Sequence, residues 1–257
     1  MAALDRFEEW IDPGTFARVI NGLESRLYGL GYKVEYGAEF RKLEDDLAET
    51  DKKALTEHFR MALNTYTPDT AFWVKVVDED SRIIAVIAAR VDQLGSQNLG
   101  EYIRNYWWRC YPDKMQNGVA AAPVQPRFLS EISGKVAYLG DLWVARDHQR
   151  KKIHEWLTPL TMFVALQKWH PDWIYCWVRP SAWNKRYPLA YGFSAVHPMG
   201  IQWLKGREPV TIDSDLVIGV NRRDWALDWL DRFGDEFPRA SHMLLAEKAQ
   251  NLNSTEE

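Results

Sequence analysis

A cluster of basic and imidazole side chains directly follows an apolar run in the stretch YLGDLWVARDHQRKKIHEWL, residues 138–157. Its members are Arg146, His148, Arg150, Lys151, Lys152 and His154. The run before them is typical of a strand, and the run after them is typical of a helix. The first N–H groups of a helix lack intrahelical partners, and the helix dipole is positive there. A strand, a basic turn and a helix start in this order therefore predict a diphosphate site.

Glycine is missing from this turn, although it usually lets the backbone approach a phosphate and adopt positive φ. We therefore expect contacts from the cationic side chains to replace part of the backbone contacts. The alternative is that these residues are solvated charges at an exposed helix start, because Lys and Arg are mostly exposed in proteins. His148 and His154 do not share a helical face at their spacing, so no metal site is predicted.

A strand–helix–strand unit would position this turn. Val136–Val144 reads as a strand, Gln149–Trp169 as a helix with one apolar face, and WIYCWV at Trp173–Val178 as a buried strand. A connection of this length requires the two strands to lie parallel, with the helix crossing one face. Pro159 lies inside the helix, where we expect it to kink the helix or to mark a late helix start.

The N-terminal third is predicted to be mainly helical. Apolar spacing indicates helices over Pro13–Tyr28 and Phe40–Asn64, the second interrupted near Thr50, with a short strand in GLGYKVEYG between them. The runs AFWVKVV and RIIAVIAARV flank the polar turn Asp78–Ser81 and predict a hairpin. Its second strand is nearly all apolar, which indicates burial on both faces.

Regularity is lost from Asp92 to Lys135, where Gly and Pro are mixed with aromatic residues. A segment of this length is often a lid or substrate loop, and a short helix over Glu101–Cys110 is the alternative. The aromatic residues are Tyr106, Trp107, Trp108 and Tyr111.

After the central unit, we expect a short helical or turn segment over Ser181–Leu189, strands in GFSAVHP and SDLVIGV, and a closing helix over Arg222–Phe233.

The composition excludes several classes of protein. With 257 residues, 46% of them hydrophobic and 26% charged, the chain can bury a core like an ordinary globular protein. A net charge of −4 argues against nucleic-acid binding. Runs such as IIAVIAA are shorter than the roughly 20 residues of a membrane helix, and Cys110 and Cys176 are too few for a disulfide framework. A cytoplasmic protein, with no membrane and no nucleic-acid partner, is the default expectation. The 13 Trp residues are core filler or the lining of a cleft.

Together these segments resemble the GNAT superfamily, the N-acyltransferases that use acetyl-CoA or another acyl thioester. The resemblance covers Phe72–Val91 and Val136–Val196. The turn looks like the family's pyrophosphate-binding motif, with Gln149 at its Arg/Gln position and Lys152 and His154 where two small residues belong. In VRPSAWNKRYPLAYGF, Gly192 and Phe193 match the family's Gly-Phe, whereas Asn184, Tyr187 and Tyr191 match in type but not in spacing.

The resemblance implies an α+β fold with a mixed, mostly antiparallel twisted sheet, a central parallel strand–helix–strand unit and flanking helices. One domain over residues 1–245 would contain a helical part (1–70), an insertion or lid (92–135) and an acyl-CoA-binding core (136–196). Residues 246–257 would form a flexible tail. The implied co-substrate is acetyl-CoA or another acyl-CoA, with no metal, and the implied partner is an amine-bearing small molecule or peptide. A homodimer is one possibility.

The resemblance also implies roles for individual residues. In some members of the family a glutamate on this strand is the base, and here Gly140 stands in its place. Asp141 is the nearest carboxylate on the strand, so it is either the base or a structural carboxylate. Tyr187 and Tyr191 compete to protonate the leaving thiolate. Backbone N–H groups around Trp143–Ala145 would hold the carbonyl oxygen. The implied donor-binding residues are Leu142, Trp143, Val144, Gln149, Arg150, Lys151, Lys152, Ile153, His154, Ser181 and Asn184.

Three functions remain open at this point. The first is a GNAT-type N-acyltransferase with acetyl-CoA as the default donor, whose amine acceptor attacks the thioester directly. The second uses a longer acyl chain or an acyl carrier protein, for which the basic turn would also be suited. The third is an inactive GNAT-like binding or regulatory module, because the turn lacks its glycines and the glutamate is absent. The N-terminal helices and the segment 92–135 are expected to form the acceptor site.

Overall fold

The computed structural model describes residues 11–111, 118–185, 187–210, 212 and 215–237. Its α-helices are α1 (Pro13–Tyr28), α2 (Phe40–Ala48), α3 (Leu99–Tyr106), α4 (Ile153–Trp169), α5 (Pro180–Asn184), α6 (Tyr187–Ala190) and α7 (Arg223–Glu236). Its 3-10 helices are η1 (Trp107–Cys110), η2 (Arg127–Ser130) and η3 (Arg146–Lys151). Its strands are β1 (Lys33–Gly37), β2 (Ala71–Val77), β3 (Ile83–Asn98), β4 (Ser133–Val144), β5 (Trp173–Val178), β6 (Ala195–His197) and β7 (Val217–Arg222).

The strands form one seven-stranded sheet in the order β1-β2-β3-β4-β5-β7-β6. β4 and β5 pair in parallel, whereas all other neighbours pair antiparallel. Helix α4 forms the crossover between the two parallel strands, as the strand–helix–strand pattern predicts. The predicted fold class, a mostly antiparallel sheet with one central parallel pair, is confirmed.

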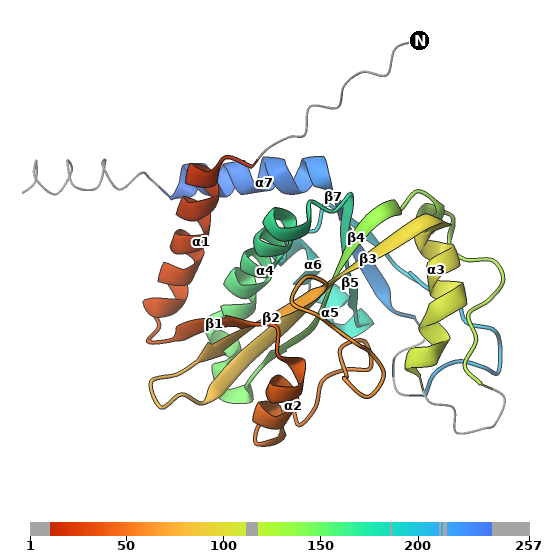
Figure 1. The fold of residues 1–257 in the computed structure, drawn as a ribbon, viewed down its shortest axis with the longest axis horizontal. Helices are drawn as coiled ribbons and strands as arrows, with labels where there is room; N and C mark the ends of the chain where they lie inside the picture. Colours follow the sequence, from red (N-terminus) through yellow and green to blue (C-terminus); the bar gives the residue numbers. More distant parts are fainter. Residues whose placement is uncertain (1–10, 112–117, 186, 211, 213–214, 238–257) are drawn as a thin grey trace, which may run out of the picture.

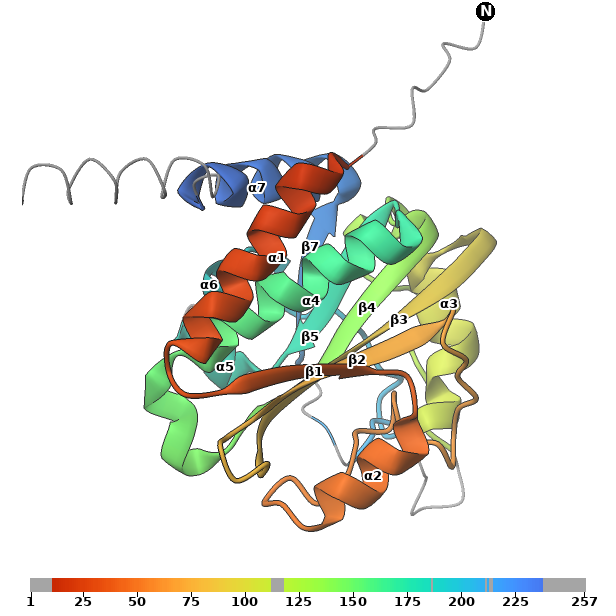
Figure 2. The ribbon, with the colours of Figure 1, turned by 60° about the vertical axis from the view of Figure 1, so that its left-hand side comes forward.

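Helices cover both faces of the sheet (Figures 1 and 2). α1, α4 and α7 lie on one face, which we call the donor face because the expected diphosphate turn leads into α4. α2 and α3 lie on the opposite face, which we call the acceptor face because the acceptor site is expected there. Successive side chains of a strand point to opposite faces, so the strands supply both cores. In β2, for example, Val74 packs in the donor-face core and its neighbour Trp73 in the acceptor-face core.

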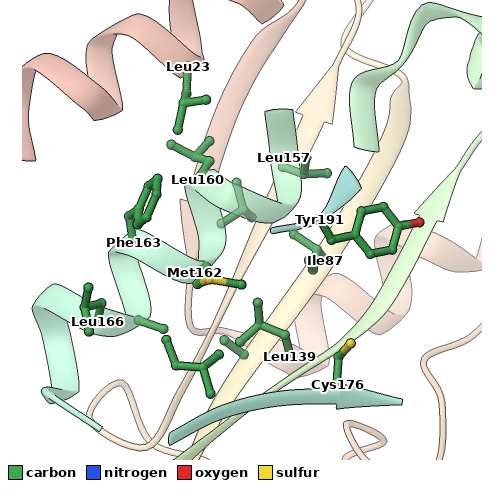
Figure 3. Packing of buried hydrophobic residues seen from close by; sticks show 14 of the residues in the cluster. Leu23, Ile87, Leu139, Leu157, Leu160, Met162, Phe163, Leu166, Cys176 and Tyr191 are labelled. Carbon is green, nitrogen blue, oxygen red and sulfur yellow. The ribbon is translucent and has the colours of Figure 1, made fainter. Parts of the chain in front are cut away.

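The donor-face core is built around α4. Leu160, Phe163 and Leu166 of this helix are fully buried, and they lie over Leu139 and Ile87 of the sheet (Figure 3). Burying each such side chain stabilises the fold by about 1.5–3 kcal/mol. The apolar face predicted for this helix is therefore the surface that fixes the crossover on the sheet.

Several predicted elements are confirmed, α1 with unchanged bounds. Asp12 caps α1 by accepting a hydrogen bond from the Thr15 N–H at 2.7 Å, and Pro13 begins the helix. β2 and β3 form the predicted hairpin, and the part of β3 that pairs with β2 is almost wholly buried. α4 begins at Ile153 after η3 and continues through Pro159 to Trp169.

The helix predicted over Phe40–Asn64 is wrong beyond Ala48, where α2 ends. Residues 49–70 form turns, because polar contacts with distant parts of the chain outweigh their helical propensity. Thr56 donates to Asp141 in β4, and the Arg90 guanidinium in β3 donates to the His58 carbonyl at 3.1 Å. Asn64 Nδ2 donates to the Glu57 carbonyl at 2.9 Å, which secures the same segment locally.

The segment 92–135 has more regular structure than a lid would need. β3 continues to Asn98, and α3 then begins with a capping box, in which the side chains of Asn98 and Glu101 each accept from the other's backbone N–H at 3.0 Å. α3 and η1 therefore correspond to the short-helix alternative over Glu101–Cys110. Residues 112–117 of this segment lie outside the described residues.

The expected flexible tail, residues 246–257, also lies outside the described residues. Among the helices of the described part, none is both long and apolar enough to cross a membrane.

Candidate active site

The two parallel strands separate halfway along their length. β4 and β5 pair from Val136 with Trp173 to Leu139 with Cys176, and the described residues contain no β4–β5 pair beyond that point. The remaining half of β4, from Gly140 to Val144, stays paired with β3. A gap therefore opens in the middle of the sheet, next to the start of α4.

A cavity of about 510 Å³ occupies this gap. Its donor-face lining includes Leu139, Leu142, Thr158, Cys176, Val178, Ser181, Tyr191 and Phe193. Its acceptor-face lining includes Lys52, Thr56, Glu57, His58, Tyr111, Tyr138, Trp143, Trp177, Ile212 and Leu216. Because the lining belongs to both cores, the cavity reaches both faces of the sheet.

A β-bulge shapes the β4 side of the cavity. Val86 pairs with Trp143 and Ala88 pairs with Gly140, so Ile87 faces two residues, Asp141 and Leu142. Asp141 has a left-handed backbone with φ 59°. Such a bulge interrupts the regular β3–β4 ladder at Asp141 and Leu142, which both line the cavity.

Asp141, the predicted candidate base, is committed to other contacts. Its side chain is fully buried, and its Oδ1 lies 2.6 Å from Lys52 Nζ. It also accepts hydrogen bonds from the Thr56 N–H at 3.0 Å and the Thr56 hydroxyl at 2.8 Å. A carboxylate that accepts this many bonds is suited to anchoring residues 49–70 on β4, the structural role considered above.

Gly140 leaves no room for a side chain. A Cβ at this residue would lie 2.8 Å from Tyr138 Oη and 2.9 Å from Phe59 Cε2. The rings of Tyr138 and Phe59 stack at 5.6 Å between centroids and fill the space. Where the resemblance leads one to expect a glutamate, the cavity instead holds the Tyr138 ring.

His58 and Tyr111 form a buried polar pair in the same part of the cavity. His58 Nε2 lies 2.6 Å from Tyr111 Oη, and both residues are at least 95% buried. His58 Nδ1 is also buried and has no hydrogen-bond partner among the described residues. Burial, together with the positive charges of Arg90 and Arg109, lowers the pKa of His58 well below its usual value. The imidazole is therefore neutral at pH 7.

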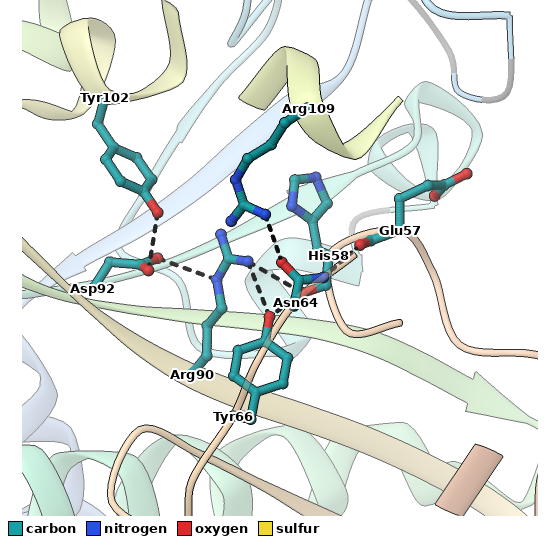
Figure 4. A network of polar contacts seen from close by, with 8 residues as sticks. All are labelled: Glu57, His58, Asn64, Tyr66, Arg90, Asp92, Tyr102 and Arg109. Atoms are coloured by element: carbon teal, nitrogen blue, oxygen red, sulfur yellow. Dashed lines mark hydrogen bonds and ion pairs between the residues drawn. The ribbon is translucent and has the colours of Figure 1, made fainter. Parts of the chain in front are cut away.

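A buried arginine network holds this pair in place (Figure 4). Arg90 forms an ion pair with Asp92 at 3.1 Å and donates to the Tyr66 hydroxyl at 3.2 Å, in addition to the His58 carbonyl. Arg109 donates to Asn64 Oδ1 at 3.2 Å. Buried charges that are paired and hydrogen-bonded fix the surrounding backbone, so the network determines where the His58 side chain lies.

The basic turn contains a residue with left-handed backbone, although the absence of glycine was expected to disfavour positive φ there. Lys152 takes φ 58° and ψ 22° at the N-cap of α4, which is the backbone state that a glycine would supply. The local geometry of the turn is therefore kept without glycine, at a cost of about 1–2 kcal/mol for a residue with a Cβ.

Replacing Lys152 with glycine is expected to raise the free energy of unfolding by about 0.5–1 kcal/mol, because glycine removes this strain but also gains freedom in the unfolded chain. The ion pair lost with Glu155 is exposed, with a separation of 3.4 Å, and contributes little. Urea denaturation would measure the change. Lys152→Val should be less stable than the wild type, and equal stability of all three proteins would contradict the conformation described.

The cations of the turn differ in what they contact. Lys151 Nζ lies 2.6 Å from the Tyr32 hydroxyl, which is also 2.7 Å from His148 Nδ1. Lys152 pairs with Glu155, as noted. Arg146 and Arg150 are exposed and have no ion pair or hydrogen bond within the described part of the chain. These two arginines are therefore the uncommitted cations of the turn.

The other predicted donor-binding residues are only partly brought together. Leu142, Trp143 and Ser181 line the cavity, whereas Val144 and Ile153 are buried outside its lining. Gln149 Nε2 donates to the Val144 carbonyl at 3.3 Å. Asn184 is exposed on α5, away from the cavity lining.

Of the two candidate tyrosines, Tyr191 lines the cavity and Tyr187 does not. Figure 3 shows the Tyr191 hydroxyl pointing away from the donor-face core. His154 lies beside both rings, with centroids 5.1 Å from Tyr187 and 5.8 Å from Tyr191. Burial raises the pKa of Tyr191 above its usual value, so its hydroxyl keeps its proton at neutral pH and can donate it.

The cavity lining contains residues that the sequence did not single out. His58, Thr56 and Lys52 lie in a segment whose spacing indicated a helix, and Thr158 lies in an apolar helix. The aromatic cluster of segment 92–135 gave a partial signal: Tyr111 lines the cavity, Trp107 is buried against His58, and Tyr106 and Trp108 are exposed.

No known family model matches the sequence, and no curated protein matches it.

Solved N-acetyltransferase structures are similar to this chain at low identity. NAA60 from Arabidopsis thaliana, in complex with a bisubstrate analogue, shares 11% identity at a TM-score of 0.41, and the match covers 74% of this chain and 98% of that one. A variant of the spermidine N-acetyltransferase SpeG from Vibrio cholerae shares 12% identity at a TM-score of 0.41, covering 77% and 98%. A GNAT-family acetyltransferase from Staphylococcus aureus Mu50 shares 9% identity at a TM-score of 0.40, covering 74% and 99%.

Proposed function

We propose that the protein is an N-acyltransferase that transfers an acyl group, by default acetyl, from acyl-CoA to an amine. The observation that carries the proposal is the cavity between the separated halves of β4 and β5, which is lined by residues from both faces of the sheet. An acyl thioester and an amine could meet in such a gap from opposite faces. Direct attack would then require no covalent enzyme intermediate.

The donor face supports binding of acyl-CoA. Arg146 and Arg150 are uncommitted cations in a turn that leads into the N-terminus of α4, where a diphosphate is favoured. Thr158 Oγ1 lies in the cavity wall, is buried, and has no partner among the described residues. A bound substrate would satisfy this hydroxyl, so the residues present fit a CoA thioester, which supplies the activated acyl group.

The cavity also offers groups for the transfer step. The β4 bulge takes Leu142 out of the regular pairing with β3, so its N–H is the group that would stabilise the developing oxyanion, whereas Trp143 stays paired with Val86. Ala145 is excluded, because its N–H donates to the Ile84 carbonyl at 2.7 Å. The Tyr191 hydroxyl is the proton donor for the leaving thiolate, in preference to Tyr187, because Tyr191 alone of the two lines the cavity.

The acceptor face supports an amine with an apolar or aromatic body. Trp143, Trp177 and Tyr138 provide aromatic walls, and Glu57 provides a carboxylate with no ion pair among the described residues. An ammonium group would be attracted by Glu57 and by the aromatic faces. An arylalkylamine is therefore the first acceptor to test.

Binding of acetyl-CoA is the first test. We expect acetyl-CoA at 100 times its Kd to stabilise the protein by about 2.7 kcal/mol, measured as an increase in Tm. Replacing both Arg146 and Arg150 with alanine should weaken binding by about tenfold or more, because a hydrogen bond to a charged group contributes about 1.5–3 kcal/mol when it is well formed.

Two controls make this test specific. Arg41→Ala removes an exposed cation from α2, on the acceptor face, and should leave the affinity unchanged. S-acetylpantetheine lacks the diphosphate, so the arginine changes should not affect its binding. Unchanged acetyl-CoA affinity in the double variant would contradict the role given to the two arginines, and the absence of any thioester binding would contradict the proposed function.

A further inference from the structure

We propose that Tyr111 and His58 form the proton acceptor of the transfer reaction. In this assignment, which rests on the proposed acyl transfer, Tyr111 Oη takes a proton from the acceptor ammonium while its own proton moves to His58 Nε2. The resemblance implies a carboxylate base on β4, but Asp141 is fully engaged by Lys52 and Thr56, and Gly140 has no space for a side chain.

The geometry supports such a relay. Both residues line the cavity on the acceptor face, and the 2.6 Å separation of Oη and Nε2 is that of a strong hydrogen bond. For Nε2 to accept, the neutral imidazole must carry its proton on Nδ1. The ring is held on its other sides by Trp107, at 4.2 Å between centroids, and by Tyr138, at 5.3 Å.

The charges around His58 keep its imidazole neutral in the resting protein, and they also make it a weak base. Arg90 from β3 and Arg109 from η1 face it, Tyr138 faces it from β4, and Glu57 precedes it in the chain. The two arginines and the buried setting disfavour a resting imidazolium. When the proton of a bound ammonium passes to His58, the substrate becomes a neutral amine and His58 becomes an imidazolium. The positive charge therefore moves within the cavity, and no new charge is created.

The reaction balances without an added reagent. The ammonium gives one proton to the Tyr111–His58 pair and becomes the neutral amine that attacks the thioester carbonyl. As the C–N bond forms, the C–S bond breaks, the nitrogen loses a second proton, and the sulfur ends as a thiol. His58 then releases its proton to water, so each turnover yields one amide, one thiol and one free proton.

The test compares two amines that differ in acidity. Thiol release from acetyl-CoA is measured with 2-phenylethylamine, which is almost entirely ammonium at pH 7, and with 2,2-difluoro-2-phenylethylamine, whose fluorines make the ammonium far more acidic. Tyr111→Phe removes the hydroxyl and keeps the ring, and His58→Gln removes the final acceptor. We expect kcat/KM for 2-phenylethylamine to fall by about 100-fold or more in both variants. The loss for the difluoro amine should be much smaller, because that amine needs little help to become neutral.

The pH profile gives an independent readout. In the wild type, kcat/KM for 2-phenylethylamine should be nearly flat around pH 7, because His58 is already neutral there. In Tyr111→Phe it should rise about tenfold per pH unit up to the pKa of the amine itself, since only neutral amine would react. A purely structural role for Tyr111 would lower the whole curve without changing its slope.

Tyr36→Phe is the matched control. It removes a hydroxyl that donates to Glu24 at 2.6 Å, outside both the arginine network and the cavity lining, and it should behave like the wild type. If His58→Gln does not fold, Tyr111→Phe decides the question, with acetyl-CoA affinity as the check on its fold. Equal losses with both amines, or wild-type rates in Tyr111→Phe, would overturn the assignment while leaving acyl transfer intact. A wild-type protein that binds acetyl-CoA but releases no thiol with either amine would overturn the transfer reaction and this assignment with it.

Discussion

Replacing Asp141 with alanine is expected to lower the free energy of unfolding by about 3–5 kcal/mol, the effect of leaving one member of a buried ion pair without its partner. The Lys52 side chain is 9% exposed and that of Asp141 is 0% exposed, so neither charge is screened by solvent. The change also removes the acceptor of the Thr56 N–H and hydroxyl. Urea denaturation would measure the loss.

The companion variants separate anchoring from catalysis. Adding Lys52→Met to Asp141→Ala should restore part of the stability, since it removes the uncompensated cation, and a double-mutant cycle would give the coupling between the two residues. If Asp141 instead acted as the base, Asp141→Asn would fold with nearly normal stability and lose transfer activity. That result would contradict the anchoring role.

Gly192→Ala is expected to lower the free energy of unfolding by about 2–4 kcal/mol, combining left-handed strain with overpacking. Gly192 has φ 80°, and a Cβ there would lie 1.6 Å from Trp229 Cη2. The Trp229 ring cannot move freely, because it packs against Phe163 at 5.3 Å and Phe233 at 5.2 Å between centroids. Since Gly192 joins Tyr191 to Phe193 in the cavity wall, acetyl-CoA affinity should also fall.

Gly206→Ala provides the control for backbone strain alone. Gly206 has φ 79°, almost the same as Gly192, but a Cβ there would have nothing within 4 Å. Its replacement should cost about 1 kcal/mol and leave acetyl-CoA affinity unchanged. Equal losses at the two glycines would show that contact with Trp229 contributes nothing.

Elements specified by neighbouring residues could be predicted from the sequence. The start of α1 depends on Asp12 and Pro13, and the β2–β3 hairpin on two apolar runs around a polar turn. The parallel pairing of β4 and β5 follows from a helical crossover between buried strands. The predicted donor turn joins β4 to α4 as expected, although none of residues 146–154 lines the cavity, so its role in binding the donor stays a prediction.

Features that depend on distant residues could not be predicted. Residues 49–64 have helical spacing, but Asp141 and Arg90 hold them in turns, so His58 was not recognised as part of a site. The left-handed state of Lys152 was missed because residue type alone argues against it, whereas the strand before it and the helix after it impose it. The filled space at Gly140 depends on Phe59, which lies in the same misassigned segment.

The contacts that hold residues 49–70 also have a consequence for the order of folding. Thr56 reaches Asp141 across 85 positions in the sequence, and the His58 carbonyl reaches Arg90 across 32. Closing loops of this size costs chain entropy, and the segment has no helix of its own to offset that cost. We therefore expect residues 49–70 to dock on the sheet after β3 and β4 have paired, so that the half of the cavity wall that they supply is completed late in folding.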